Sequence, residues 1–344
     1  MPVALWMRRL AIAGVLLCFA VVVLGAYVRL TAAGLGCPDW PGCYGHLSPV
    51  GAAHSNNLQE SFPDRPLEVG KAWREMIHRY AVGTLSCLVL ALAVLAVRTR
   101  RQRLVSVPLA LALVATLIVQ ALLGMLTVTW RLNPLIVTAH LVFGMTTLAL
   151  LWWLTLSLPT STWGAAAMGS AGRSISGGGG SPLASARSLT LIGLAALIVQ
   201  IVLGGWTSSN YAALACPDLP TCQGTLWPHA DFAHAFELWH GPINYEGGVL
   251  DNPARVAIHL THRLGAVLAA MALTVAAVFV LRRRGLVAAR PRAWGVLAAL
   301  GLQLLIGTSM VLKSFPLWLA TAHTAGAALL LLATLALLRA LSAR

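Results

Sequence analysis

The chain has 344 residues, of which 58% are hydrophobic and only 10% are charged, and its mean hydropathy is +0.79. Soluble domains carry about 25% charged residues, so this composition excludes a soluble globular protein and indicates an integral membrane protein. The net charge of +14 could suggest a nucleic-acid partner, but the arginines cluster between apolar segments, as signals of membrane topology do. We therefore predict no nucleic-acid partner.

Eight apolar segments are long enough to cross a bilayer as helices, which takes about 20 residues each. In chain order they lie at roughly residues 10–30, 76–97, 104–129, 134–158, 187–207, 254–281, 291–312 and 316–340. Arg8 and Arg9 before the first segment could belong to a cleaved signal peptide, but the segment is long for one. We therefore predict an all-α membrane protein with eight transmembrane helices.

Charged residues are unevenly distributed between these segments. All ten Asp and Glu residues lie in, or at the edge of, the segments near 31–73 and 208–253. Arginines cluster instead at Arg8 and Arg9, Arg98 to Arg103, Arg173 and Arg187, Arg282 to Arg292, and Arg339 and Arg344. Arginine-rich connections stay in the cytoplasm, so we predict a multi-pass protein of the bacterial inner membrane with both termini cytoplasmic.

The chain reads as two copies of one four-helix unit. An offset of about 180 residues pairs CPDWPGC with CPDLPTC, and a single offset of 183 pairs three polar or small residues late in each half. Those pairs are Gln120 with Gln303, Gly124 with Gly307, and His140 with His323. Four helices per unit give both copies the same orientation, so we predict two tandem four-helix bundles related by a parallel internal repeat.

A Gly/Ser-rich stretch separates the two copies and is typical of a flexible linker. We predict an N-terminal half at 1–158, a cytoplasmic linker at 159–186 and a C-terminal half at 187–344.

Two cysteine pairs lie in the predicted outer segments, Cys37 with Cys43 and Cys216 with Cys222. Disulfides persist on the oxidising face of a membrane, so we predict a disulfide within each pair. These bridges could be structural staples, or they could form a thiol relay, since exposed short-loop disulfides can be labile.

Each even-numbered helix carries a histidine near its outer end: His78, His140, His262 and His323. A single intramembrane histidine is more often a satisfied packing residue than a ligand, but four at one depth indicate a function. Two imidazoles per half could clamp a flat metallomacrocycle. Haem fits better than zinc, because haem iron accepts one or two axial imidazoles whereas zinc needs further protein ligands.

Arg79 and Arg263 each follow one of these histidines. They could pair with haem propionates, or they could extend to the outer interface. His259 lies one turn outward from His262 and is the weaker ligand candidate, because the repeat aligns His262 with His78.

These motifs occur together: ExxHR beginning at Glu75, HR at His262, TAH ending at His140 and at His323, and CPDWPxC at Cys37. In combination they resemble the heme A synthase family over nearly the full chain. The resemblance implies oxidation of a porphyrin methyl group of haem O to a formyl group, giving haem A for cytochrome oxidase. It also implies a substrate haem between His78 and His140, a haem b cofactor between His262 and His323, and a catalytic carboxylate at Glu75.

Two other functions share the same ligands: a bis-histidine dihaem electron-transfer cytochrome and a haem-handling assembly factor. Glu75 separates them from an oxidase, because it gives one haem a nearby acid where the second copy has His259. The resemblance implies haem O and the lipid bilayer as partners, together with haem O synthase and cytochrome oxidase assembly factors. Whether the chain forms a homo-oligomer stays open.

Overall fold

The computed structural model describes residues 2–55, 61–63, 65–102, 104–158 and 182–342. Within these ranges the protein is helical, with two isolated β-bridges and no β-strand. Eight helices are long and apolar enough to cross a membrane, which confirms the predicted all-α membrane fold. They are α1 (Pro2–Leu30), α4 (Val69–Arg98), α5 (Val107–Thr129), α6 (Pro134–Ser157), α7 (Pro182–Ser209), α9 (Asn252–Arg282), α10 (Arg290–Leu312) and α11 (Leu317–Ser342).

Three helices begin earlier than hydropathy predicts, and the first is α1, which begins at Pro2 and not near residue 10. Helix α4 begins at Val69 and not near residue 76, because its first turns carry Lys71, Arg74 and Glu75, which lower hydropathy without preventing backbone hydrogen bonding. Helix α7 begins at Pro182, so residues 182–186 of the predicted linker are helical. The remaining linker residues, 159–181, lie outside the described residues.

Local sequence explains where other helices start. Asn133 caps α6 by accepting hydrogen bonds from the amides of Leu135 and Ile136, and Pro134 supplies the first helical position. Asp251 caps α9 in the same way and is followed by a proline within the first turn. A capping side chain satisfies amides that the helix leaves free, and proline suits the first turn because it has no N–H to lose.

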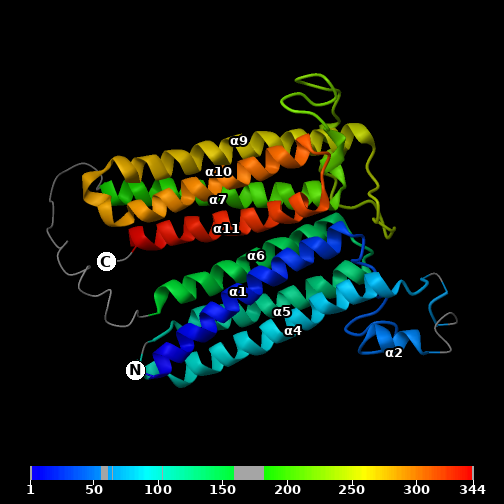
Figure 1. Ribbon diagram of the computed structural model, residues 1–344, viewed down its shortest axis with the longest axis horizontal. Helices are drawn as coiled ribbons and strands as arrows, with labels where there is room; N and C mark the ends of the chain where they lie inside the picture. The colour runs from blue at the N-terminus through cyan, green and yellow to red at the C-terminus, as the bar shows by residue number, and fades with distance from the viewer. Residues whose placement is uncertain (1, 56–60, 64, 103, 159–181, 343–344) are drawn as a thin grey trace.

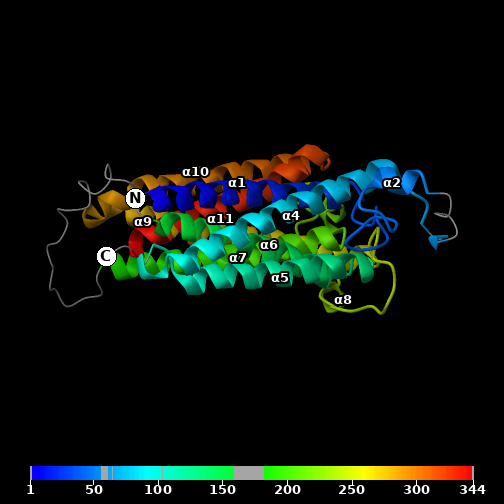
Figure 2. The same ribbon diagram turned by 90° about the horizontal axis from the view of Figure 1, so that it is seen from below.

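Each half of the chain forms a bundle of four helices (Figure 1). In the N-terminal bundle α1 and α5 both pack against α4 and α6, and in the C-terminal bundle α7 and α10 both pack against α9 and α11. The two bundles lie side by side and meet through α1, α6, α7 and α11. Figure 2 shows the helices running roughly parallel, with the short helices α2 (Pro49–Ala53) and α8 (Phe232–Ala235) at the end opposite the start of α1.

Polar contacts join the bundles near this loop-bearing end. The Arg29 guanidinium donates to the Ser208 carbonyl at 3.0 Å and lies 4.2 Å from the centre of the Tyr211 ring. The Tyr245 amide, in the segment between α7 and α9, donates to the Arg131 carbonyl between α5 and α6 at 3.0 Å. These contacts join the loop end of the first bundle to the segment between α7 and α9.

Candidate functional site

The four predicted histidines share one packing arrangement. Each ring lies against a glycine of a neighbouring helix, where an added Cβ would come within 3.0–3.3 Å of the ring Cε1. The pairs are His78 with Gly25, His140 with Gly124, His262 with Gly204, and His323 with Gly307. Glycine at these positions lets an imidazole enter the bundle without a clash.

The structure brings His262 and His323 close together. In the C-terminal bundle the ring centres of His262 and His323 are 6.5 Å apart, which leaves room for a metal between opposed imidazoles, since a metal–imidazole bond is about 2 Å long. His78 and His140 occupy the corresponding helices, α4 and α6, of the N-terminal bundle.

Buried polar atoms at these pairs are available to a ligand. The Nδ1 atoms of His78, His140 and His323 are buried and have no hydrogen-bond partner among the described residues. Leaving such an atom unpaired costs about 1–3 kcal/mol. Across the part of the chain that the structure describes, no group of three or more His, Cys, Asp or Glu side chains could hold a metal ion. Paired imidazoles between apolar helices fit the axial ligands of a haem iron.

His259 has a different environment from His262. Its Nδ1 lies 3.1 Å from the Ala212 carbonyl oxygen, its ring packs edge-on against Phe315, and only 4% of the residue is exposed. A hydrogen-bonded, buried histidine of this kind is a structural residue. These contacts support the assignment of His262 as the ligand candidate of α9.

Glu75 lies in the second helical turn of α4 and is 4% exposed. One carboxylate oxygen accepts a hydrogen bond from the Cys37 amide at 2.9 Å, and the other lies 2.5 Å from the guanidinium of Arg79. A buried carboxylate is stable only when such donors compensate for lost hydration. Glu75 is therefore hydrogen-bonded directly to the first cysteine loop, the segment closed by the Cys37–Cys43 disulfide.

The two arginines next to the ligand candidates bind loop carbonyls. Arg79 donates to the carbonyl oxygens of Asp39, Pro41 and Gly42, and Arg263 donates to those of Cys216, Asp218 and Thr221. Charge-assisted hydrogen bonds of this kind are about twice as strong as neutral ones. Each arginine thus fastens a cysteine loop over its bundle, and the suggested propionate contact stays a prediction.

Both cysteine loops have the same internal structure. Cys37 is bonded to Cys43, and Cys216 to Cys222. In the first loop the carboxylate of Asp39 accepts hydrogen bonds from the amides of Tyr44 and Gly45 at 2.6 and 2.8 Å.

In the second loop Asp218 accepts from the amides of Gln223 and Gly224 at 2.7 and 3.0 Å. Hydrogen bonds from the Thr221 hydroxyl and then the Gly224 amide hold the pKa of Asp218 below its ordinary value. The aspartate of each CPD motif is therefore the internal acceptor of its loop.

Comparison with known proteins assigns the chain to a family. Residues 8–335 match the model of the cytochrome oxidase assembly protein family. The chain belongs to this family. It is 41% identical to a heme A synthase of Shewanella oneidensis over 95% of this chain and 93% of that protein. A heme A synthase of Caulobacter vibrioides is 28% identical over 96% of this chain and 93% of its own length.

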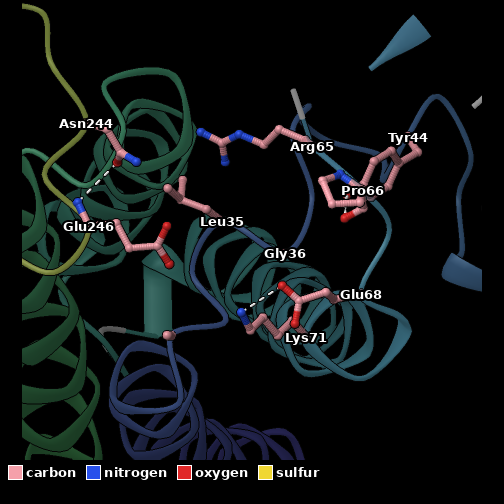
Figure 3. A pocket seen from close by; sticks show the side chains of 10 residues that line it. Leu35, Gly36, Tyr44, Arg65, Pro66, Glu68, Lys71, Asn244 and Glu246 are labelled. Atoms are coloured by element: carbon pink, nitrogen blue, oxygen red, sulfur yellow. Dashed lines mark hydrogen bonds and ion pairs between the residues drawn. The ribbon is translucent and has the colours of Figure 1, made fainter. Parts of the chain in front are cut away.

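This member of the cytochrome oxidase assembly protein family also has a polar cavity of about 210 Å³ beside the first cysteine loop (Figure 3). Residues of both outer segments line it, including Gly36, Arg65, Lys71 and Glu246. None of the four predicted histidines is among its lining residues. Gly36 precedes Cys37, whose amide donates to Glu75, so the cavity adjoins the loop that holds the acid.

Three site residues in this family member were not predicted as such from the sequence. Gln120, Gln200 and Gln303 place their side-chain amides against His140, His262 and His323. The repeat pairs Gln120 with Gln303 but does not by itself indicate that either contacts a histidine. The available signal is a glutamine four residues before the glycine that contacts a histidine, which recurs at three of the four histidines.

Proposed function

We propose that this chain is a haem A synthase, which oxidises a porphyrin methyl group of haem O to a formyl group and supplies haem A to cytochrome oxidase. The observation that carries the proposal is the combination of two histidine pairs on the membrane helices with one buried acid among the described residues. Family membership and full-length similarity to heme A synthases support the same reaction.

We assign haem O to the N-terminal bundle, with His78 and His140 as axial ligands, and haem b to the C-terminal bundle, with His262 and His323. The difference between the bundles supports this division. Glu75 lies one turn from His78, whereas the corresponding residue of the second copy is His259, which is engaged with Ala212. An acid is needed only where carbon is oxidised.

The reaction assigns distinct tasks to the residues of the first bundle. Converting a methyl to a formyl group removes hydrogen from the carbon and adds an oxygen atom, which water can supply, so protons must leave the site and electrons must pass to an external acceptor. Haem b would supply one-electron transfer. Glu75 is the one buried acid among the described residues of this bundle, and it can accept a proton from the methyl carbon or stabilise positive charge that develops there. Arg79 and the Cys37 amide hold its carboxylate in place.

The reaction also suggests a path for the released proton. Glu75 accepts a hydrogen bond from the Cys37 amide. Gly36, the residue before Cys37, lines the polar cavity. Its charged lining residues Glu68 and Lys71 form an ion pair at 2.8 Å that is partly exposed to solvent. A proton leaving Glu75 would then pass to solvent through this cavity.

The membrane helices agree with a lipid bilayer as the immediate surroundings of the protein. We propose that it lies in the bacterial inner membrane with both termini cytoplasmic and the histidine pairs near the outer face. The position of the acidic residues in the cysteine-bearing segments supports this orientation. Haem O synthase and cytochrome oxidase assembly factors are the protein partners that this reaction would need, and a homo-oligomer is a further proposal.

Pigment analysis of the purified protein tests the proposed function. After co-expression with a haem O synthase, extracted pigments are expected to include haem b together with haem A or hydroxylated haem O. Haem b alone would instead identify an electron-transfer cytochrome. Haem O bound but unchanged would identify a haem-handling factor.

The two disulfides are predicted to have a structural role and to carry no electrons. They close loops that Arg79 and Arg263 also hold, through hydrogen bonds to backbone carbonyls. Replacing both Cys37 and Cys43 by Ser should lower thermal stability and haem content in part while leaving measurable haem A formation. Cys87→Ser, which changes an exposed free cysteine, is the matched control. A Cys37→Ser protein that keeps both haems but makes no haem A would support a thiol relay and contradict the predicted structural role of the disulfide.

A further inference from the structure

The segment between α7 and α9 exposes large apolar side chains. Six of them, each with between 38% and 65% of its surface exposed, form what we call the aromatic strip: Trp227, Phe232, Phe236, Leu238, Trp239 and Ile243. Exposed apolar surface of this kind marks a site of contact with another protein or with a membrane. The position of the strip along the membrane helices distinguishes between these two partners.

Helix α8, which carries part of the strip, lies against the sides of two membrane helices. The Ala235 carbonyl accepts a hydrogen bond at 2.9 Å from the indole of Trp206, which lies three residues before the end of α7. Ala235 also belongs to one buried cluster with Ala257 and Ile258, in the second turn of α9. Figure 2 shows α8 at the level of the outer turns of α5. Helix α8 is therefore packed beside the outermost turns of the bundle and not above its end.

These outermost turns lie in the headgroup layer of the bilayer. Helix α9 has 31 residues and α7 has 28, so at 1.5 Å per residue they are about 46 and about 42 Å long. The hydrocarbon core of a bilayer is about 30 Å thick, and the headgroup layers bring the total to about 40–45 Å. Both helices thus extend through the headgroups, and a segment packed on their last turns lies at headgroup depth.

An aromatic pair places a second part of the strip at the same depth. Trp239 packs edge-on against Trp130, with the ring centres 5.4 Å apart, and 48% and 44% of the two residues are exposed. Trp130 is the C-cap of α5, whose 23 residues span about 35 Å and so barely exceed the hydrocarbon core. Tryptophan favours this boundary, because its ring is apolar and its N–H can bond to water or headgroups.

The strip also continues a surface that already faces lipid. Leu264 and Leu268 of α9 are 53% and 61% exposed, as expected for side chains of a membrane helix in contact with acyl chains. On α8, Phe232 and Phe236 lie one turn apart and are exposed, whereas Ala235 between them is buried against the bundle. One face of α8 is therefore bound to protein and the other is free to contact lipid.

The segment is suited to lipid contact through apolar side chains and not through charge. The sequence contains no Lys or Arg between Arg187 and Arg255. The carboxylate of Asp231 is satisfied within α8, since it accepts from the amides of Ala233 and His234 at 3.0 and 3.2 Å and pairs with the His234 ring at 2.6 Å. Binding to this segment therefore needs no anionic headgroup.

We propose that residues 226–243 form an interfacial membrane anchor, in which the aromatic strip is buried in the headgroup layer of the leaflet on the loop-bearing side. The Tyr245 amide, which follows the strip directly, is bonded to the Arg131 carbonyl of the first bundle. The anchor therefore holds the outer ends of both bundles at one depth in the bilayer. This inference goes beyond the proposed function and does not depend on haem.

The first test labels the strip in the full-length protein in phosphatidylcholine nanodiscs. Phe232→Cys and Trp239→Cys are each made in a Cys87→Ser protein, because Cys87 is the exposed free cysteine and Cys18 is buried. Each is labelled with an environment-sensitive fluorophore. The emission of both labels should shift to shorter wavelength than in water, and a phosphatidylcholine that carries a nitroxide close to its headgroup should quench it.

Asn244→Cys in the same background is the matched control, because Asn244 belongs to the same segment but lines the polar cavity. Its label should emit as in water and should not be quenched by the nitroxide lipid. Labels on Phe232→Cys and Trp239→Cys that both behave like this control would overturn the inference and would leave the strip to a protein partner.

A second measurement needs no substitution, so it holds even if the labelled variants do not fold. Hydroxyl-radical footprinting of the wild-type protein in the same nanodiscs reports the oxidation of single side chains. Trp227 and Trp239 are 65% and 48% exposed in the protein alone, but in lipid both should be protected, as Leu268 of α9 should be. Oxidation of both indoles at the rates that these exposed fractions imply would contradict the anchor.

Discussion

Glu75→Gln is expected to abolish haem A formation while the protein still folds and binds haem. A positioned acid or base contributes about 10²–10⁴-fold to a rate, and the amide of glutamine can neither accept a proton nor balance developing positive charge. Folding should survive because glutamine keeps one oxygen that can accept from the Cys37 amide, and Arg79 keeps three loop carbonyls. Haem O or a partly oxidised form should therefore accumulate in the purified protein.

Glu68→Gln provides the control for this experiment. Glu68 precedes the same helix and pairs with Lys71 at 2.8 Å, but 60% of its side chain is exposed. Its replacement should leave haem A formation within about twofold of the wild type, since exposed ion pairs contribute about 0–1 kcal/mol. A Glu75→Gln protein with normal haem A output would show that the Glu75–Arg79 pair is structural.

His262→Ala and His323→Ala are each expected to remove the low-spin haem b signal. Each variant takes away one of the two imidazoles proposed to hold haem b and leaves a void between apolar helices, so the haem would be held by a single histidine. Optical spectra of the purified variants should show either no haem b or a high-spin form. Haem A formation should fall together with the haem b content, since haem b would supply electron transfer in the proposed reaction.

His259→Ala tests whether His262, and not His259, is the haem ligand on α9. His259 binds the Ala212 carbonyl and packs against Phe315, so its replacement should cost about 1 kcal/mol for the hydrogen bond and leave the haem b spectrum intact. The opposite pattern, with haem b lost in His259→Ala and kept in His262→Ala, would contradict the alignment of His262 with His78.

The transmembrane helices and both disulfides could be predicted from the sequence because they depend on local properties. Span number follows from the length of apolar segments, and a separation of six residues allows Cys37 to reach Cys43 through one short loop. The predicted first residues of the helices were less accurate, because charged residues such as Lys71 lower hydropathy within a continuous helix. The four histidines were found for the same local reason, as rare polar residues in apolar segments.

Only the tertiary structure decided which groups meet across helices and loops. Glu75 contacts an amide 38 residues away, Arg79 binds carbonyls of the cysteine loop, and Gln200 reaches His262 across 62 residues of chain. Such contacts depend on how each helix is rotated about its axis and where each loop returns, and neither is encoded in hydropathy or in the spacing of a single motif. The sequence by itself determined a membrane protein with paired imidazoles and one acid, and the packing of two bundles decided how each imidazole and that acid are held.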